Sequence, residues 1–426
     1  MSLLLLAVLI IGLILIGVPL GFSIIAASMA TLWIDGGTNP VIMAQRLFAG
    51  MDSFTLLAIP FFLLTGSLMT RGGMTRRLID FANALVGRFS GGLAMSNVVA
   101  STFFSGISGS AVADTSMLGR IFIPAMVKEG YSRSFSVATT AASSVVAPII
   151  PPSIAAIVYG VVAGESIVRL FVAGLIPGLL LGGGILFGAY FISRRRAYPV
   201  HDPVSWHELW RTFLRASGAL ALPVLILVGI VGGVFTVTEC SAVAVAYALL
   251  VGSLGYRELD LRGCIDALRE TVHTTAVIMI IVGAAQLFAW QLAYANAPQA
   301  AVELMTGLTQ SPVLFLLLIA GFLLFVGTFM EANAAMVMLV PVLHPAGVAL
   351  GVDPIHMGVL VIVTLCLGLI TPPIGLCLAV ACKIADLPLE HSLKDILPFL
   401  LLGVATLLAL IFIPGLTLWL PGVLFD

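Results

Sequence analysis

Residues 147–153 read Ala-Pro-Ile-Ile-Pro-Pro-Ser and interrupt the apolar run from 134 to 163. Proline lacks a backbone N–H and its ring displaces the carbonyl four residues earlier. Pro151 therefore predicts a broken helix with the carbonyl of Ala147 freed. Such a carbonyl is too costly in hydrocarbon unless it lines a cavity or meets a partner. The break indicates a functional site, and a simple packing kink is the alternative.

A second stretch has the same arrangement. Residues 368–375 read Gly-Leu-Ile-Thr-Pro-Pro-Ile-Gly within the apolar run 355–382, and Pro372 should free the carbonyl of Gly368. Sodium is a hard cation that suits carbonyl oxygens, and unwound helices of transporters coordinate it in this way. Because both breaks carry a double proline, we favour ion binding over two unrelated kinks.

The composition predicts an all-α polytopic membrane protein. Of the 426 residues, 60% are hydrophobic and 9% are charged, whereas soluble domains have about 25% charged residues. The mean hydropathy of +1.17 agrees. The net charge of −1 offers no basic face for nucleic acid. The five cysteines form no CxxC pair, and the sequence contains no HExxH, GxSxG or Walker motif, so we expect neither a zinc site nor an enzyme.

A membrane-spanning helix needs about 20 apolar residues. The predicted spans are 3–33, 54–70, 134–163, 166–193, 217–235, 237–254, 272–293, 355–382 and 393–420. We interpret 3–33 as an uncleaved first span, because no basic segment precedes it. The runs 91–127 and 312–346 are each interrupted near the middle by small and polar residues. Each predicts a re-entrant helical hairpin, and two ordinary spans joined by a tight turn are the alternative.

The basic residues predict the orientation. An N-terminus in the cytoplasm and a C-terminus in the periplasm place all but three of the 19 basic residues on the inside, as cytoplasmic loops require. The exceptions are Arg46, Arg120 and Arg169. Segment 74–88 predicts an amphipathic helix on the inner surface, and segment 201–215 another.

The chain contains a predicted internal repeat. A shift of 221 residues aligns the two double prolines and places Glu165 on Asp386. Each half then contains a hairpin, an interrupted span, an acidic turn and a long final span. The predicted units are 1–193, a cytoplasmic connector at 194–216, and 217–426. Opposite orientations of the halves would make inverted repeats, the architecture of many secondary transporters. Chance similarity between Leu-rich helices is the alternative.

The hairpin tips carry candidate ligands. Ser105, Ser108 and Ser110 offer hydroxyls at the first tip, and Gly327, Thr328 and Asn333 lie at the second. Helix N-termini begin at both tips, and their positive ends can hold a carboxylate. Close helix packing also favours small residues, so packing is an equal alternative for any single serine.

Ionisable residues at membrane depth are functional candidates by default. The candidates are Asp114, Arg120, Glu239, Glu331 and His344. Asp114 and Arg120 could instead neutralise each other, Glu331 could face outer water, and His344 could be interfacial.

Five motifs together resemble one transporter family. They are SGISGSAVADTSMLG (105–119), KEGYSR (128–133), APIIPPS (147–153), FMEANAAM (329–336) and ITPPIG (370–375). The chain resembles, over essentially its whole length, the large membrane subunit of tripartite ATP-independent periplasmic (TRAP) transporters. This resemblance implies a member of the wider ion-transporter superfamily with an elevator mechanism, in the bacterial inner membrane.

The resemblance also implies the activity and the partners. A sodium gradient would import an organic anion, such as a C4-dicarboxylate or a sialic acid, delivered by a periplasmic binding protein. A small four-helix membrane subunit would be a separate chain, because nothing precedes the first span. The alternatives are a stand-alone sodium- or proton-coupled symporter or exchanger of the same superfamily, and a channel or scaffold without coupling.

Site residues follow from the same resemblance, position by position. It implies a first sodium site at Ser108, Ser110 and the carbonyls of Ala147, Ile150 and Pro152. It implies a second sodium site at Gly327, Gly368 and Thr371. The anion would lie near Ser105, Asp114 and Asn333. The second tip contains Met-Glu-Ala-Asn where the first contains Ser-Gly-Ser-Ala-Val-Ala-Asp, so we expect two chemically unequal sites.

Overall fold

The computed structural model describes residues 2–34, 39–200 and 204–425, apart from the side chains at positions 2, 3, 106–108, 304–306 and 308. Helices joined by short turns account for this part of the chain, and it contains no strand. Seven of the described helices are long and apolar enough to cross a membrane. The predicted all-helical polytopic class is therefore confirmed, although individual helices differ from the predicted spans.

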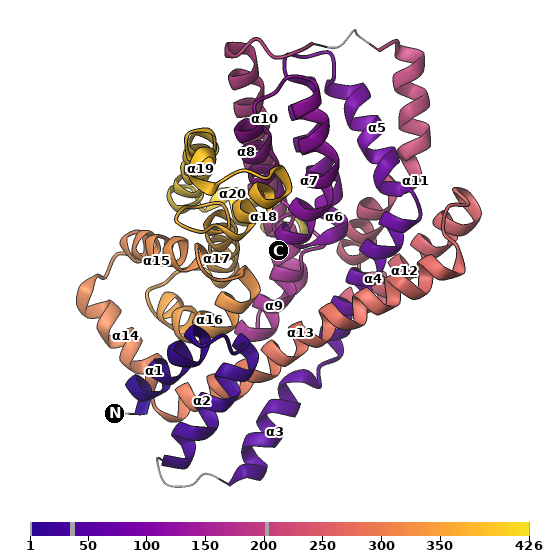
Figure 1. The fold of residues 1–426 in the computed structure, drawn as a ribbon. Coiled ribbons are helices and arrows are strands. Elements are labelled where there is room, and N and C mark those ends of the chain that lie inside the picture. Colours follow the sequence, from indigo (N-terminus) through magenta and orange to yellow (C-terminus); the bar gives the residue numbers. More distant parts are fainter. Residues whose placement is uncertain (1, 35–38, 201–203, 426) are drawn as a thin grey trace.

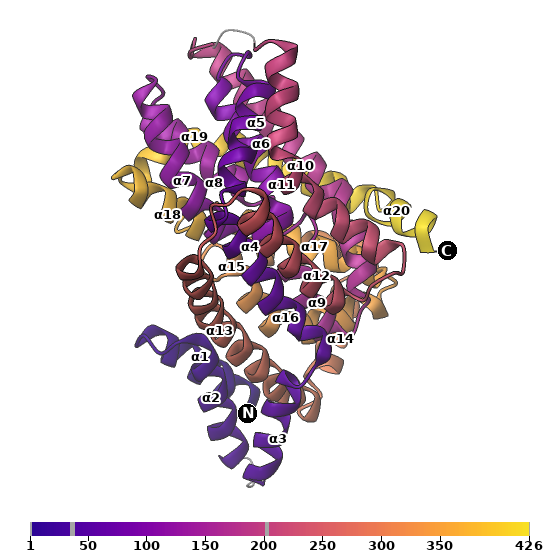
Figure 2. The ribbon, with the colours of Figure 1, turned by 90° about the vertical axis from the view of Figure 1, so that its right-hand side faces the viewer.

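The first predicted span, 3–33, is in fact two helices, α1 (Ser2–Leu15) and α2 (Leu20–Ile34). Gly17 adopts a left-handed conformation with φ +88°, which ends α1. Pro19, which has no N–H to donate, then directly precedes α2. The helix that follows, α3 (Pro40–Met51), was not predicted. Figure 2 shows α1, α2 and α3 gathered at one end of the molecule, where α2 and α3 pack along α13 (Leu261–Tyr294).

A group of helices lies on the other side of α13. It comprises η1 (Phe54–Leu57), α4 (Ala58–Arg71), α5 (Met74–Val86), α11 (Trp206–Val231), α12 (Val237–Leu250) and the π-helical turn η2 (Val251–Gly255). The amphipathic segment 74–88 was predicted to lie on the membrane surface, but α5 packs against α6 (Gly92–Ser108) and α11. The Phe81 ring lies 5.9 Å from Phe103 and 5.6 Å from Phe213. Protein therefore covers the apolar face of α5.

The predicted boundary between connector and span near residue 216 is absent, because α11 continues unbroken from Trp206 to Val231. Ser205 begins this helix by accepting a hydrogen bond from the backbone N–H of Glu208 at 3.2 Å. The described part of segment 201–215 is thus the first part of a long helix rather than a separate surface helix.

Two helical hairpins and two broken helices form the centre of the molecule. The hairpins are α6 with α7 (Ala111–Lys128), and α15 (Pro312–Gly327) with α16 (Ala332–Ala349). The broken helices are α8 (Arg133–Ser144) with α9 (Ile154–Ala163), and α17 (Pro354–Gly368) with α18 (Leu376–Ala385). Each half of the chain packs the second part of its broken helix on the other half's hairpin, α9 on α16 and α18 on α7. Figure 1 shows this interlocked centre.

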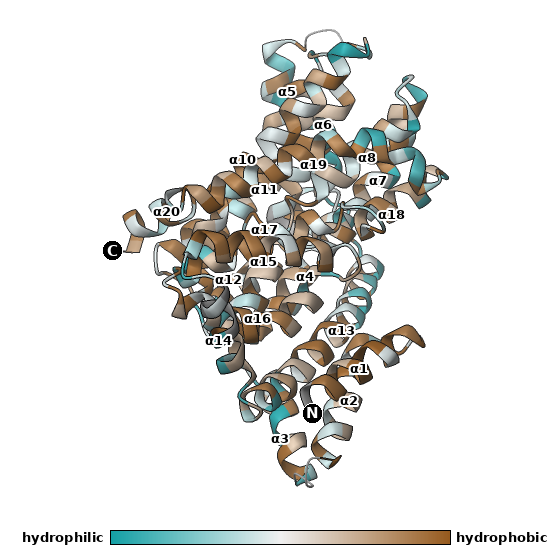
Figure 3. Cartoon of the chain, turned by 90° about the vertical axis from the view of Figure 1, so that its left-hand side faces the viewer, coloured by the Kyte–Doolittle hydropathy of each residue, from teal (hydrophilic) through white to brown (hydrophobic). Residues whose placement is uncertain are grey.

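Long helices brace the centre. They are α10 (Ile167–Arg195) and α19 (Leu389–Phe412), which pack on each other, with α14 (Ala297–Leu308) against α16. The predicted last span 393–420 is interrupted, because Pro414 separates α19 from α20 (Gly415–Phe425), which packs on α10. Figure 3 shows mostly hydrophobic helices through the middle, with hydrophilic residues gathered near the ends of α5, α7 and α8.

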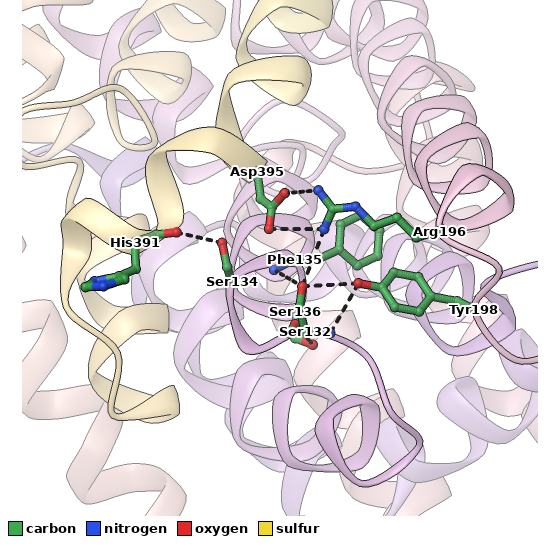
Figure 4. A network of polar contacts seen from close by, with 8 residues as sticks. All are labelled: Ser132, Ser134, Phe135, Ser136, Arg196, Tyr198, His391 and Asp395. Atoms are coloured by element: carbon green, nitrogen blue, oxygen red, sulfur yellow. Dashed lines mark hydrogen bonds and ion pairs between the residues drawn. The ribbon is translucent and has the colours of Figure 1, made fainter.

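A polar network joins α8, α10 and α19 at one end of the centre (Figure 4). Arg196 donates two hydrogen bonds to the Asp395 carboxylate, one of them at 3.3 Å. This contact raises the pKa of the Arg196 guanidinium, which keeps it charged. The Tyr198 hydroxyl donates to Ser132 at 3.1 Å, and Ser134 donates to the His391 carbonyl at 2.8 Å. The two halves of the chain are therefore tied together here.

The second hairpin meets its broken helix at two glycines. A Cβ atom on Gly368 would lie 2.5 Å from the Gly327 Cα, and one on Gly327 would lie 2.9 Å from the Leu365 carbonyl oxygen. Only glycine permits backbones to approach so closely. This crossing sets the position of the second tip relative to the break at 369–375.

We predict that Gly368→Ala destabilises the protein by roughly 1–3 kcal/mol, because the new methyl group meets backbone that cannot rotate away. The measurement is the melting temperature of the purified protein in detergent. Gly183→Ala on α10 is the matched control, since its new methyl group would meet no neighbouring helix within 4 Å. Equal melting temperatures for the two variants would contradict the described crossing.

We predict that Asp395→Asn lowers the melting temperature, because it leaves Arg196 without a carboxylate partner at a site where the Asp395 side chain is only 7% exposed. The expected loss is roughly 1–3 kcal/mol, the range for hydrogen bonds to charged groups. Arg194→Gln, which changes a neighbouring exposed cation, is the control and should have little effect. No loss in Asp395→Asn would mean that the network does not hold the two halves together.

Candidate functional site

Two adjoining cavities lie at the first hairpin tip, with volumes of about 510 and 720 Å³. Leu63 of α4, Thr274 of α13 and Ser110 of the tip line both. The smaller cavity extends to Glu331 and Asn333 at the second tip. Both tips therefore face one crevice, with α4 and α13 forming its opposite wall.

The serines of the first tip have different surroundings. Ser110 begins α7, accepts a hydrogen bond from the Ala113 backbone N–H at 3.5 Å, and lines both cavities. Ser105 is fully buried and donates to the Thr102 carbonyl in its own helix at 2.5 Å. The side chain of Ser108 lies outside the described part of the structure. Ser110 is thus the described serine of this tip that a ligand in the crevice can reach.

Asp114 is fully buried beneath the first tip and lines neither cavity. One carboxylate oxygen accepts a hydrogen bond from Ser101 of α6, and the other has no hydrogen-bond partner. Nearby, the Asn97 amide donates to Thr140 of α8 at 2.7 Å. Sequence reasoning missed Ser101, Asn97 and Thr140. The hydroxyl-rich sequence of α8, RSFSVATTAASS, was the available signal, because every residue from 135 to 144 is buried.

The first break presents the carbonyls that the sequence singled out. Ala147 and Ile150 are buried, as is Pro152, and their carbonyl oxygens accept no hydrogen bond from any described residue. Ser153 closes the break by donating to the Pro148 carbonyl and accepting from the Ala156 backbone N–H at 3.0 Å. The freed carbonyl predicted for Ala147 is therefore present in the structure. Pro151–Pro152 and Pro372–Pro373 both contain a cis peptide bond.

The second break is closed more fully by its own backbone. The Gly368 carbonyl was predicted to be free, which is wrong, because it accepts from the Thr371 backbone N–H at 3.0 Å. A tight turn after α17 makes this bond, which the proline rule alone does not foresee. The Gly375 backbone N–H donates to the Thr328 carbonyl at 3.1 Å. The Thr371 hydroxyl donates to the Leu367 carbonyl at 2.8 Å, which leaves its oxygen lone pairs available.

Glu331 neutralises the second tip. Its carboxylate accepts from the backbone N–H groups of Asn333 at 2.9 Å and Ala334 at 3.2 Å, and so caps α16. It also accepts from the Asn333 amide nitrogen at 2.8 Å, while the amide oxygen of Asn333 is buried without a partner. At the first tip the neutral Ser110 caps α7, and Asp114, the acidic residue in the first turn of this helix, is buried and lines neither cavity. The start of α7 therefore presents no carboxylate of its own to the crevice, and an anion is better placed there than beside Glu331.

The other ionisable candidates are dispersed. Glu239 forms a capping box with Thr236 at the start of α12. His344 lies 2.8 Å from the Tyr159 hydroxyl and 3.4 Å from Glu165. Arg120 lines the larger cavity and is not paired with Asp114, which contacts Ser101 instead. Within the described residues, no group of three or more His, Cys, Asp or Glu side chains could hold a metal ion.

Comparison with known proteins identifies the family. Residues 7–416 match the family described as "Tripartite ATP-independent periplasmic transporter, DctM component". The chain is 42% identical to the sialic acid TRAP transporter large permease protein SiaM of Vibrio cholerae, over 96% of each chain. It is 39% identical to the C4-dicarboxylate TRAP transporter large permease protein DctM of Pseudomonas aeruginosa, over 89% of each. It is 37% identical to the 2,3-diketo-L-gulonate TRAP transporter large permease protein YiaN of Escherichia coli, over 94% of each.

A solved structure shares the fold. The YdaH transporter of Alcanivorax borkumensis superposes with a TM-score of 0.60 over 88% of this chain and 87% of that one, at 16% identity. The family match covers nearly the whole chain, and the relatives are transporter permeases rather than enzymes. The chain therefore belongs to the DctM family, the large permease subunits of tripartite ATP-independent periplasmic transporters, and is a multi-pass membrane protein.

Proposed function

We propose that this chain imports an organic anion by sodium-coupled secondary transport and receives it from a periplasmic binding protein. The anion is a carboxylate such as a C4-dicarboxylate or a sialic acid, as the names of the relatives suggest. The observation that carries the proposal is the single cavity lined by Ser110 and Asn333, one residue from each hairpin tip. The positive end of α7 offers charge complementarity to a carboxylate there, and Ser105 and Asp114 are buried beneath the tip, outside both cavities.

The residues at the breaks fit sodium. The carbonyls of Ala147, Ile150 and Pro152, which accept no hydrogen bond from the described residues, are hard oxygen ligands, and Ser108 and Ser110 of the tip would complete the first site. Thr371 with the carbonyls of Gly327 and Gly368 would form the second site, with the Gly368 oxygen using the lone pair that its hydrogen bond from the Thr371 N–H leaves over. Bound sodium would supply positive charge next to the tips, and so couple anion binding to the ion gradient.

We further propose an elevator mechanism in inverted repeats. The crevice lies between the hairpin tips and the helices α4 and α13, although α13 also packs on α16 and α4 on α6. In an elevator the hairpins and broken helices would be the moving body, and α4 and α13 would belong to the scaffold. The reciprocal packing of α9 on α16 and α18 on α7 supports two repeats of opposite orientation that move as one body. The N-terminus would lie in the cytoplasm and the C-terminus in the periplasm of a bacterial inner membrane.

Two protein partners belong to the proposal. Relatives are large permeases of tripartite transporters, which supports a separate small four-helix membrane subunit and a periplasmic binding protein. The small subunit would enlarge the scaffold, and the binding protein would deliver the anion to the crevice. Lipid would cover the remaining apolar surface.

We predict that proteoliposomes containing this chain and its small subunit take up labelled sialic acid or succinate only when both the cognate binding protein and an inward sodium gradient are present. The reason is that the anion needs delivery to the crevice and the positive charge of sodium beside the tips. The measurement is initial uptake rate, with each component omitted in turn. Uptake without the binding protein would instead indicate a stand-alone symporter or exchanger.

We predict that Thr371→Ala raises the sodium concentration for half-maximal uptake roughly fivefold, the effect of losing about 1 kcal/mol from one ligand. Thr364→Ala is the matched control, because Thr364 is buried in α17, which precedes the break, and donates to the Leu360 carbonyl at 2.6 Å. Sodium activation that is unchanged in Thr371→Ala, or equally changed in both variants, would remove Thr371 from the site.

A further inference from the structure

The larger cavity leads away from the substrate tips along a polar path. Ser110 lines the end of this cavity at the first tip, and Ser116 and Arg120 line it further along α7. Positions 113, 116 and 120 share one helical face, so they line the same side of the cavity. On the opposite wall, Thr271 and Thr274 of α13 continue the polar lining. An anion that leaves the first tip can therefore remain in contact with polar groups.

Only one of the two arginines that line this cavity is available to such an anion. Arg71 of α4 already contacts Glu270 at 3.3 Å and Asp266 at 3.8 Å, and Ser67 donates to the same Glu270 at 2.8 Å. Arg120 is exposed in the cavity and has no ion pair or hydrogen bond to any described residue. A guanidinium that lines a cavity without a partner among the described residues is free to pair with an anionic ligand during the transport cycle.

We propose that Arg120 forms a second anion site, at which the carboxylate of the transported substrate pairs with the guanidinium as it moves between the tips and the far end of the larger cavity. This inference rests on the proposed import of an organic anion. A guanidinium binds a carboxylate through two parallel hydrogen bonds, which favours this ligand over neutral solutes.

The location of Arg120 determines which step it assists. Its Cα lies ten residues beyond the tip residue Ser110, or about 15 Å along the helix at 1.5 Å per residue, so the guanidinium is too far away to share the first contacts at the tip. Glu270 faces the same path and would repel an anion if no free cation were present. Arg120 should therefore increase the rate at which the anion moves through the larger cavity, without changing the affinity of the tips for the anion.

The test is uptake by proteoliposomes that contain the complete transporter, with labelled sialic acid or succinate as the probe. We expect Arg120→Gln to lower the maximal uptake rate about tenfold, as loss of one charge-assisted contact implies. The half-saturating concentrations of loaded binding protein and of sodium should stay unchanged. Arg120→Lys, which keeps the charge, should recover a substantial part of the rate.

Lys128→Gln is the matched control, because Lys128 is an exposed cation in the last turn of the same helix and lines neither cavity. It should transport at the wild-type rate. A wild-type rate in Arg120→Gln overturns the second anion site, as does an equal loss in Arg120→Lys or a changed sodium requirement. Failure of the wild-type protein to take up either probe counts against the proposed import itself, so the two failures are distinguishable.

Discussion

Unpaired backbone carbonyls inside a membrane protein are the constraint on which this structure depends. Lipid hydrocarbon offers no hydrogen-bond donor to such oxygens. The chain must therefore enclose them in protein or pair them with a cation. The first break buries the carbonyls of Ala147, Ile150 and Pro152, and no residue in the described part of the chain donates a hydrogen bond to them. Gly174 of α10 permits close packing, because a Cβ there would lie 2.5 Å from the Ile149 carbonyl oxygen. The hairpin on one side and the bracing helix on the other thus keep these carbonyls away from lipid.

The two halves of the chain have similar hairpins and breaks, but the hydrogen bonds and charges at these places differ. The second break satisfies the Gly368 and Thr328 carbonyls with its own backbone N–H groups, and Glu331 satisfies the start of α16. The first break pairs the Pro148 carbonyl with Ser153 but leaves those of Ala147, Ile150 and Pro152 without a hydrogen bond from the described residues, and the neutral Ser110 caps α7. Asp114, the acidic residue in the first turn of α7, is buried away from both cavities, whereas Glu331 lines the cavity at the second tip. A carboxylate in the crevice would therefore be better placed at the first tip. The sequence origin of this difference is the change from Ser-Gly-Ser-Ala-Val-Ala-Asp to Met-Glu-Ala-Asn, because the acidic residue lies within the first turn of α7 but at the N-cap of α16.

Sequence reasoning succeeded where a rule acts within one helix turn. The rule for proline predicted the break at Pro151, and the small residues around Gly109 predicted the turn between α6 and α7. The long apolar segments predicted the helical class. It failed where several parts of the chain decide together. Nothing near α5 indicates that Phe103 and Phe213 will cover it, and Gly368 is paired through a turn formed beyond the proline rule. Packing between distant segments places α13 opposite the first tip. It also places Asp114 against Ser101 rather than against Arg120.

Direct sodium binding tests the central claim, that the buried carbonyls at the breaks hold a cation. The measurement is equilibrium binding of ²²Na⁺ to the purified complex of this chain with its small subunit, without substrate. The account predicts saturable binding that unlabelled sodium displaces and potassium does not, because the carbonyls are held by packed helices at a fixed spacing. Binding that does not saturate, or that potassium displaces equally well, would contradict it and would mean that the breaks serve packing alone.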